Sequence, residues 1–487
     1  MDSLGKNAVV VFICLMAGTA SLAQNAVDIL SETPANLPRI KDVRAVTRGP
    51  KHHFFGYYAI CPWDPTGRDI VCMETDFGDR DVAPDDRAGI CLVNVDTGEI
   101  RRIAETTAWN FQQGALVHWL GGGGEKRRIV FNDVVSGKLK ARVLDVDWGE
   151  ERVLPRAITS VAHNGKTAAC ISFGRLNHTR PGYGYPGVDD PYKDQPHPAD
   201  DGLFIMDIET GETHLAVSYK DVFEAAPPPE DHTGQTMWFN LVIFSRDARH
   251  VAFLSRYKGI ERGWYTALFT VNVDGSELRC VLPYDWGCSH FDWVDADRLV
   301  ATTRYKGKLW CHCLFTNGKD DHRPVAPSIL KQDGHCHASW DGRWMVTDSY
   351  PTGSRRMQHF YVMDMRNEEV ALLARFHEPE QYHGHWRCDL HPRWSRDCRS
   401  VCIDSTHNGT RQVYVVDLAM PENLKPEKRR SAGNRSQRPA VPRGVLLDAP
   451  HAHAGNPSGP GFHGFRQPCL SRQVAKIAKK SPVQEAR

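Results

Sequence analysis

Short apolar runs separated by tight polar turns fill most of the chain, and the helical spacing of apolar residues is nearly absent. One turn phrase recurs, in which a polar residue, Asp or Gly, and a basic residue precede an apolar strand. Its clearest copies are Asp64–Cys72, Ser245–Phe253, Trp340–Val346 and Ser395–Cys402. Weaker copies at His163, at Asp295 and in the glycine-rich stretch 121–131 bring the number to seven. Each copy predicts a tight turn between two antiparallel strands.

A second phrase follows most of these turns: an apolar strand that ends in Asp, and then another turn. It occurs at Cys91–Gly98, Phe204–Gly211, Leu268–Gly275, Phe360–Asp364 and Val413–Asp417. Two hairpins per repeat make a four-stranded antiparallel blade, and a period of roughly fifty residues is typical of a propeller. A β-sandwich is the alternative, but the repeated unit argues against it. The sequence therefore predicts an all-β, seven-bladed β-propeller over residues 37–420.

Three segments are expected to lie outside the regular blades. The stretch before the first blade would add the outer strand that closes the ring. The insertion His178–Asp201, rich in Pro, Gly and Asp, predicts a long loop on one face. Residues 421–487 begin with a basic, polar run and continue as Pro-, Gly- and His-rich sequence, which predicts disorder and leaves open the binding of an anionic partner.

The N-terminus has the pattern of a secretory signal. Lys6 precedes the apolar run Ala8–Ala17, and Ser21–Ala23 offers small residues at a cleavage site, so residues 1–23 are interpreted as a signal peptide. The apolar run is too short to span a bilayer; a buried strand is the alternative. The mature protein is therefore expected to be secreted or periplasmic, without membrane insertion.

Composition narrows the partners. The formal net charge is +1, so no global field favours nucleic acid, and an acidic substrate would need a local basic patch. The chain has 14 cysteines, and oxidising surroundings would allow some to pair. The candidate pairs are Cys398 with Cys402 and Cys280 with Cys288, although spacing does not settle pairing.

Three histidines occupy the same place in successive repeats. His290, His335 and His391 each stand eight residues before the basic residue of their turn phrase, which is Arg298, Arg343 and Arg399 respectively. Equivalent residues of neighbouring blades lie at the same radius and height, and this place is near the start of the innermost strand. The register therefore predicts three imidazoles at one mouth of the central channel.

Three convergent imidazoles suit a divalent Zn or Mn ion, with Cys388, Asp389 or water completing the ligand set. The alternative is three separate histidines that line the channel and bond to water or backbone. Other residues that could bind metal lack this register: His337, His383, His385 and the run Cys311–Cys313.

Further polar clusters are expected on the same face. They are Asn110, Gln112 and Gln113 at the opening of the second blade, Asn240 and Arg256 in the fourth, His178, Arg180 and Tyr185 in the insertion, and His53 near the start. Aromatic rings stack on sugar faces and arginine pairs bidentately with carboxylates, so such a groove fits an acidic sugar polymer. The alternative is that the aromatic residues form the core between blades.

Five phrases carry a family resemblance: His52–Tyr58, Trp109–Gly114, Ser289–Trp293, Asp333–Cys336 and Arg387–Ser395. The chain from Asp42 to Leu418 resembles the β-propeller polysaccharide lyases, which include oligogalacturonate lyases and are similar in architecture to ulvan lyases. The resemblance implies a seven-bladed propeller that cleaves pectin- or ulvan-type uronic-acid glycans by β-elimination, with an anionic oligo- or polysaccharide as partner. We expect a monomer.

The resemblance also implies roles. His335 matches one metal ligand of the family, and His391 matches part of the next ligand segment. The family has a second His where this chain has Asp389, so the shell is altered. The family's catalytic His corresponds to His290, and its catalytic Arg, in the preceding blade, to Arg256, with Arg262 as the other candidate.

β-Elimination itself needs a cation at the uronate carboxylate, a base for the C5 proton and an acid for the O4 leaving group. His290 would serve as the base, and Tyr185 or His178 as the acid. The rival hypothesis is a non-catalytic, TolB-like periplasmic scaffold that binds protein or glycan. A propeller hydrolase is a weaker rival, because the chain shows no motif for a carboxylate pair or an activated Ser.

Overall fold

The computed structural model describes residues 26–121, 126–259 and 263–421. All structural statements below concern these residues, which belong to one compact unit. The expected signal peptide lies outside them, and so does the expected disordered tail 421–487, apart from Pro421.

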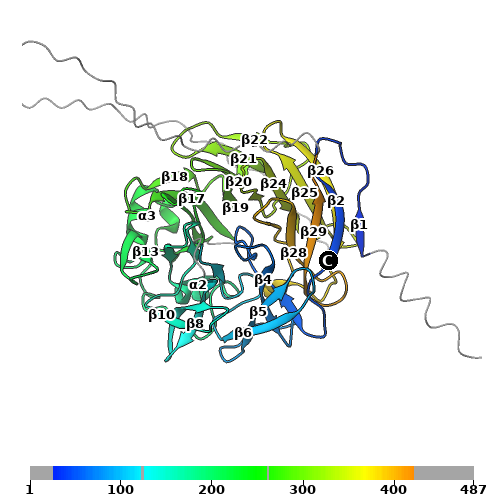
Figure 1. Cartoon of the computed structure of the whole chain (residues 1–487). Coiled ribbons are helices and arrows are strands. Elements are labelled where there is room, and N and C mark those ends of the chain that lie inside the picture. Colours follow the sequence, from blue (N-terminus) through cyan, green and yellow to red (C-terminus); the bar gives the residue numbers. More distant parts are fainter. Residues whose placement is uncertain (1–25, 122–125, 260–262, 422–487) are drawn as a thin grey trace, which may run out of the picture. The chain divides into compact units, whose positions relative to one another are not determined.

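Seven antiparallel sheets are arranged around a common centre (Figure 1), which confirms the predicted seven-bladed β-propeller. Blade 1 comprises β3 (His52–Phe54), β4 (Asp69–Thr75), β5 (Ala88–Asn94) and β6 (Ile100–Thr106). Blade 2 comprises β7 (His118–Trp119), β8 (Arg128–Val135), β9 (Lys138–Asp145) and β10 (Glu151–Leu154). Blade 3 comprises β11 (Ser160–Val161), β12 (Thr167–Cys170), β13 (Gly202–Asp207) and β14 (Thr213–Ser218).

The remaining blades follow in chain order. Blade 4 comprises β15 (Met237–Phe244), β16 (His250–Lys258), β17 (Trp264–Asn272) and β18 (Arg279–Leu282). Blade 5 comprises β19 (Cys288–Trp293), β20 (Arg298–Tyr305), β21 (Leu309–Thr316) and β22 (Arg323–Val325). Blade 6 comprises β23 (His337–Ala338), β24 (Trp344–Asp348), β25 (Met357–Asp364) and β26 (Glu369–His377). Blade 7 comprises β27 (Arg393–Trp394), β28 (Ser400–Ser405), β29 (Gln412–Ala419) and β2 (Arg39–Ala45).

The two ends of the ring meet in blade 7, where β2 pairs antiparallel with β29 and supplies the outer strand. This closure matches the expectation for the stretch before the first blade. The sequence analysis did not foresee β1 (Val27–Ile29), which pairs with β26 as a fifth strand of blade 6 and lies before the expected start at residue 37. An outer strand otherwise presents unpaired backbone groups, and β1 covers those of β26.

The recurring turn phrase joins the first and second strands of each blade, and its residues show why. In blades 4, 6 and 7 the first residue of the phrase is Ser245, Ser339 or Ser395. Each hydroxyl donates to the Asp two residues later and accepts from the backbone N–H five residues later. These local hydrogen bonds pair polar groups of the turn, and the chain then returns antiparallel to the preceding strand.

The insertion in blade 3 begins with a short helix that the sequence analysis did not predict. Helix α2 (Phe173–Thr179) is capped by Ser172, and the rest of the insertion lacks regular secondary structure as expected. The fully buried Arg175 of α2 donates to the carbonyls of Tyr192, Gln195 and Pro196, and so holds the loop in place.

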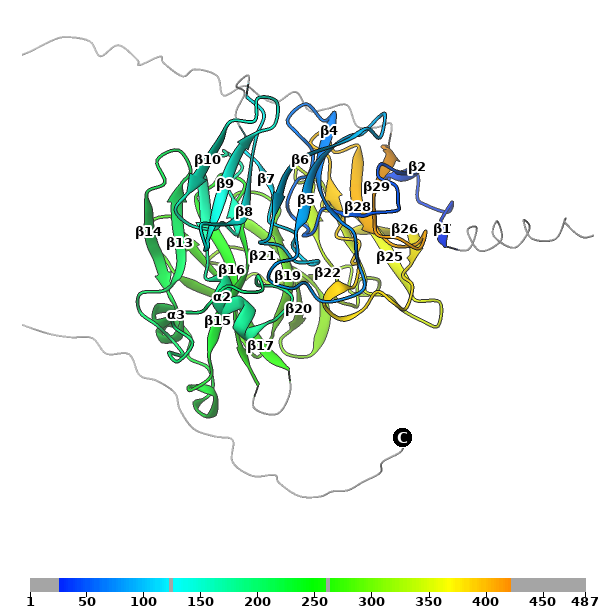
Figure 2. The ribbon, with the colours of Figure 1, turned by 90° about the horizontal axis from the view of Figure 1, so that it is seen from below.

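A second short helix, α3 (Tyr219–Ala225), follows β14, and Figure 2 shows both helices toward the same side of the ring. Two 3-10 turns, Glu230–His232 and Gly384–Trp386, complete the helical content of the described part. Among the described residues, no helix has the length and apolar character to cross a membrane.

Aromatic residues fill the spaces between blades, as the alternative interpretation of the tryptophans held: Trp109, Trp238, Trp293, Trp344 and Trp394 are all fully buried. All cysteines in the described ranges are free thiols, so neither candidate disulfide forms. Cys280 and Cys288 belong to strands of different blades, and the Sγ of each donates to a carbonyl two residues later.

Candidate functional site

An irregular backbone brings the three in-register histidines to the mouth of the channel. The antiparallel register of β19 with β20 shifts between Cys288 and Phe291, so that His290 lies in the irregularity. His391 has a φ of 44°, and Leu241, its equivalent in blade 4, has a φ of 49°. A left-handed conformation is uncommon in a residue other than glycine and persists only where the surrounding structure holds it.

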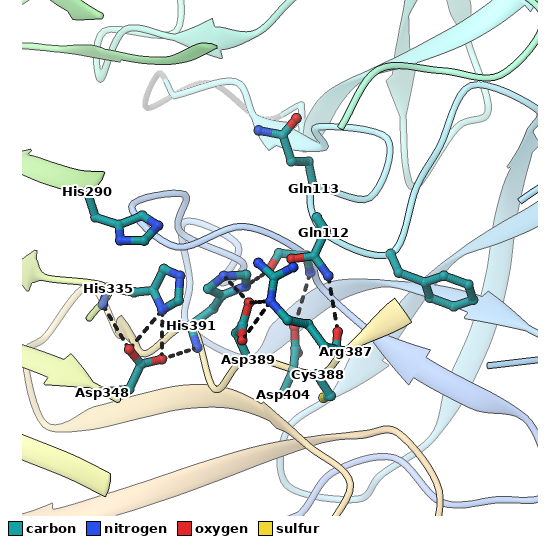
Figure 3. Close-up of polar contacts among 12 residues, drawn as sticks. Gln112, Gln113, His290, His335, Asp348, Arg387, Cys388, Asp389, His391 and Asp404 are labelled. Atoms are coloured by element: carbon teal, nitrogen blue, oxygen red, sulfur yellow. Dashed lines mark hydrogen bonds and ion pairs between the residues drawn. The ribbon is translucent and has the colours of Figure 1, made fainter. Parts of the chain in front are cut away.

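The three imidazoles pack against one another (Figure 3). The ring centroids of His290 and His335 are 4.1 Å apart, and those of His335 and His391 are 4.2 Å apart. The buried ring of Tyr58 contacts all three, with centroid distances of 5.5, 5.3 and 6.1 Å. Tyr58 belongs to a loop of blade 1 that leaves the sheet after Phe54, and its hydroxyl bonds to both backbone groups of Phe291.

Each histidine is oriented through its Nδ1 atom. His335 Nδ1 donates to Asp348 (2.8 Å to Oδ1), His391 Nδ1 donates to the Gly56 carbonyl (2.6 Å), and His290 Nδ1 donates to Asp333 Oδ1 (3.0 Å). The partner of Nδ1 fixes the tautomer. A neutral ring so held presents the lone pair of Nε2, which is the form that binds a metal or accepts a proton.

Asp348 belongs to a set of residues that connect the blades. The fifth position of the second strand carries a hydrogen-bonding residue in four blades: Asn132, Thr302, Asp348 and Asp404. Each bonds to the inner segment of the next blade. Asp348 accepts from His335 N and His391 N as well as from His335 Nδ1, so one buried carboxylate positions two of the histidines.

Asp389 joins two of these histidines in a group that can hold a metal ion. One donor atom each from His335, Asp389 and His391 lie within 4.8 Å of one another, and all three residues are buried. His391 Nε2 lies 3.7 Å from Asp389 Oδ2 and has no hydrogen-bond partner among the described residues. Two imidazoles with a carboxylate suit Zn or Mn, and an unpaired buried nitrogen is accounted for when it binds an ion, so the residues fit the predicted metal.

Cys388, the other expected ligand, lies outside this group. Figure 3 shows its sulfur directed away from the histidines. Its backbone N–H donates to Glu378 and its carbonyl accepts from Gln358, which fixes this stretch in an extended form. Successive side chains of an extended chain point to opposite sides, so Asp389 faces the site and Cys388 the interior. Burial raises the pKa of the thiol, which further disfavours the thiolate.

Electrostatics separate the roles of the histidines. Burial, and then the neighbouring His335, lower the pKa of His290, so its imidazole is neutral at neutral pH. Burial likewise places the pKa of His391 well below its usual value. Burial opposes the charging of His335 too, but Asp348 outweighs it and raises the pKa of that imidazole.

The structure shares its fold with two solved structures. An oligogalacturonate lyase from Vibrio parahaemolyticus has a TM-score of 0.54 and 16% sequence identity, with 80% of this chain and 96% of that chain covered. An oligogalacturonate lyase in complex with manganese has a TM-score of 0.53 and 14% identity, with 78% and 95% covered. No family model matches the chain, and no curated protein matches it in sequence. At such identities the similarity establishes the propeller fold, and the resemblance to ulvan lyases stays a prediction.

Arg387 is a site residue that the sequence analysis missed. Its Nε lies 2.9 Å from Asp389 Oδ2, and its Nη2 donates to the Tyr183 hydroxyl at 2.8 Å. The ring of the half-buried Tyr350 lies 5.6 Å from the centroid of His335 and 5.6 Å from the Arg387 guanidinium. The alternation Arg387, Cys388, Asp389 was the available signal, because residues two apart on an extended chain share a side.

The expected catalytic arginine is buried close to His290. Arg256 Nη2 donates to the Ser289 carbonyl at 3.5 Å, while its Nε and Nη1 have no partner in the described ranges. Both side-chain polar atoms of Asn240, and Oε1 of Gln113, are also buried and unpaired there. Native structures leave few such groups without protein, water or ligand partners, so these donors and acceptors are available to a ligand or water. Arg262 lies outside the described residues.

Other expected residues have structural partners. Tyr185 is fully buried, stacks on Phe173 (4.6 Å between centroids) and accepts a hydrogen bond from Asn132. His178 is half exposed, with Nδ1 3.5 Å from Asp190. Neither contacts the three histidines, because the packing of the insertion commits their side chains elsewhere.

The polar residues of the second blade and of the N-terminal stretch shape the surrounding loops. Asn110 accepts from the N–H groups of Gln112 and Gln113 and donates to the Tyr183 carbonyl. Gln112 donates to the Arg387 carbonyl. His53 is buried between Gln412 and Glu74.

Arg180 lies against two aromatic rings. Its guanidinium carbon is 3.7 Å from the centroid of the Tyr183 ring and 4.7 Å from that of Trp264. Trp264 is 50% exposed. A cation held between two aromatic faces is a suitable contact for an acidic sugar.

Proposed function

We propose that this chain is an exported, metal-assisted lyase that cleaves uronic-acid-containing, pectin-type oligo- or polysaccharide by β-elimination. The observation that supports it most is the contact between His290 and the potential metal group. His290 presents a free Nε2 lone pair beside His335, while His335, His391 and Asp389 form the group itself. A base next to a cation site is the arrangement that removal of a proton α to a carboxylate requires.

His335 and His391, through Nε2, and Asp389, through its carboxylate, would hold a divalent Mn or Zn ion. Such an ion, when bound, neutralises the uronate carboxylate and acidifies its C5 proton. Arg387 holds Asp389 by the ion pair described above and so fixes the carboxylate toward the histidines.

His290 would accept the C5 proton at Nε2. The hydrogen bond from Nδ1–H to Asp333 leaves Nε2 unprotonated before the transfer. The Asp333 carboxylate then stabilises the imidazolium that the transfer forms. Although burial alone would raise the pKa of Asp333, His290 and a hydrogen bond from Ser289 hold it well below its usual value. Asp333 is therefore charged when His290 takes up the proton.

Tyr350 is our candidate for the acid that protonates O4, in place of Tyr185 and His178. Burial, followed by Asp333 and Asp389, places the pKa of Tyr350 well above its usual value, so the phenol keeps its proton. The buried Nε and Nη1 of Arg256 and the guanidinium of Arg180 would donate to substrate carboxylates or hydroxyls.

The test is a substrate panel. The purified protein is incubated with polygalacturonate, oligogalacturonides, ulvan, alginate and glucuronan, with and without a chelator, and the ultraviolet absorbance of the unsaturated uronate product is followed. We expect a rise on the pectin-type substrates that the chelator suppresses and that added Mn restores. His214→Ala, an exposed histidine on the outer strand of blade 3, is the matched control and should leave the rate unchanged.

Absence of product on every substrate, in a protein shown by elemental analysis to contain metal, would contradict the proposal and favour the TolB-like binding scaffold. A scaffold has no use for three histidines oriented in one mouth, nor for the unpaired buried groups of Arg256 and Asn240. These features are the reason for placing the enzyme first.

A further inference from the structure

The opposite end of the central channel carries a second polar pocket that the proposed reaction does not use. The inner strands start at the histidine cluster and end at the turn phrases, so residues of the turns surround the other mouth. We call it the far pocket and define it by His118, His163, Trp340 and Arg396, with Ala59 and Ile60 at its inner end. Its cavity volume is about 50 Å³, so it takes only a small ligand.

Three lining residues of the far pocket come from one repeat position, and a fourth residue of that position, Arg246, packs on one of them. His163, Arg246, Trp340 and Arg396 are each the second residue of the turn phrase, in blades 3, 4, 6 and 7. Their side chains meet: the ring centroids of His163 and Trp340 are 5.0 Å apart, and the guanidinium carbons of Arg246 and Arg396 lie 5.2 and 5.6 Å from the Trp340 ring. The same logic of equivalent positions that gathers three histidines at one mouth gathers two cations around an indole at the other.

The pocket is separate from the histidine cluster. The chain runs from Tyr58, which packs on the three histidines, directly to Ala59 and Ile60, which line the far pocket. The buried Tyr58 ring, held at its hydroxyl by Phe291, therefore belongs to the wall between the two sites. No residue named as a potential metal ligand or base lines the far pocket.

The pocket carries one uncompensated positive charge. Arg246 forms an ion pair with Asp292, with Nη2 3.1 Å from Oδ2. Arg396 bonds only through Nε, to the carbonyls of Trp63 and Asp64 at 3.3 and 3.2 Å. No carboxylate pairs with Arg396 within the described ranges, which leaves both of its Nη groups available to an anion.

Two buried polar atoms of the lining also lack partners. Nε1 of Trp340 is a donor and Nε2 of His118 an acceptor or donor, and neither has a hydrogen bond among the residues described. The His118 side chain belongs to a residue that is only 7% exposed. Burial lowers the pKa of His118 to about 3, against a smaller opposing effect of the Thr159 backbone, so the ring is neutral and does not add charge.

We infer that the far pocket binds a small hydroxylated carboxylate, with Arg396 and the Trp340 N–H on the carboxylate and His118 on a hydroxyl group. The uncompensated guanidinium selects an anion, and the indole N–H adds a second donor of the kind that carboxylates accept. The neutral imidazole, deep in the pocket, selects ligands that also carry a hydroxyl group. This inference does not depend on the proposed lyase activity.

Isothermal titration calorimetry with lactate and with propionate tests the inference, since the two differ only in the hydroxyl group and lactate has no glycosidic bond for a lyase to cleave. We expect saturable binding of lactate that is weakened at least about tenfold by Arg396→Gln, the change that corresponds to one lost charge-assisted hydrogen bond. Arg399→Gln is the matched control: it removes the same charge from an exposed position of the same turn and should leave the affinity unchanged. His118→Phe should reduce the affinity for lactate to that for propionate.

Absence of saturable lactate binding, or equal affinity in the wild type and Arg396→Gln, would overturn the inference. Binding that disappears with His335→Ala but persists in Arg396→Gln would do the same, because the ligand would then occupy the histidine cluster. If circular dichroism shows that Arg396→Gln does not fold, Trp340→Phe, which keeps an aromatic ring but removes the indole N–H, must weaken binding. Loss of lyase activity in any of these proteins has no bearing on the result, so the two proposals fail independently.

Discussion

Replacement of Asp348 by Asn tests how the histidine cluster is held. The Asp348 carboxylate is 2% exposed and accepts from three donors, which are His335 N, His335 Nδ1 and His391 N. A carboxamide has one oxygen, so at least one donor would face an NH₂ group. A lost hydrogen bond to a charged group is worth about 1.5–3 kcal/mol, and a buried donor left unpaired costs about 1–3 kcal/mol.

We therefore expect Asp348→Asn to lower the free energy of unfolding by about 2–5 kcal/mol in urea or guanidinium titrations. The same change frees the His335 ring to rotate or change tautomer, and loss of such an outer-shell partner typically costs about 10- to 100-fold in metal affinity. Calorimetric titration of the metal-free protein with Mn²⁺ or Zn²⁺ measures the second effect.

Asn132→Asp is the matched control for this prediction. Asn132 occupies the same strand position in blade 2 and bonds to both backbone groups of Ile158, far from any metal candidate in sequence and blade. The isosteric change should destabilise the ring to a similar extent and leave metal affinity unchanged. An Asp348→Asn protein with unaltered stability would refute the role of Asp348 as a connection between blades, and one with unaltered metal affinity would refute its role in orienting His335.

Three further predictions address the site, the buried charge and the ring closure. His290→Ala should abolish elimination while the metal content by elemental analysis stays near wild type, whereas His391→Ala should lower both; equal activity in the two variants and the wild type would contradict the site assignment. Arg393→Met removes the partner of the buried Asp404, whose Oδ1 lies 3.0 Å from Arg393 Nη2. The change should lower the free energy of unfolding by about 3–5 kcal/mol. The control Arg399→Met, at an exposed turn, should not show this loss. A chain that starts at Asn36 lacks β1, and its free energy of unfolding should lie within about 1 kcal/mol of that of a chain that starts at Ala26. A chain that starts at Thr47 also lacks β2 and should show no cooperative unfolding transition. A cooperative transition in this shortest chain would show that closure of the ring by β2 is dispensable.

Repetition explains why the sequence predicted the propeller and the histidine cluster. A turn phrase such as Ser245–Asp247 fixes its own hairpin through local hydrogen bonds, so its position in the sequence marks the blade. Once blades are marked, residues at equal intervals from the turns occupy equal places in the ring. For this reason the sequence alone predicts that His290, His335 and His391 lie close together.

Residues in irregular segments could not be assigned in the same way. Tyr183 and Tyr185 stand two apart in a loop without period, and only the packing of the loop decided that Tyr183 contacts Arg387 while Tyr185 is buried against Phe173. The alternation of Arg387, Cys388 and Asp389 indicated a shared side for Arg387 and Asp389, but only the structure showed their ion pair.

The sequence by itself thus determined the number of blades, their order and the convergence of residues in register, because these follow from local turn chemistry repeated along the chain. Only the tertiary structure decided that Asp389 rather than Cys388 faces the histidines, that Asp348 orients two of them, and that β1 covers blade 6. These features depend on side-chain direction in irregular backbone and on contacts between residues far apart in sequence, and neither is encoded in a local pattern.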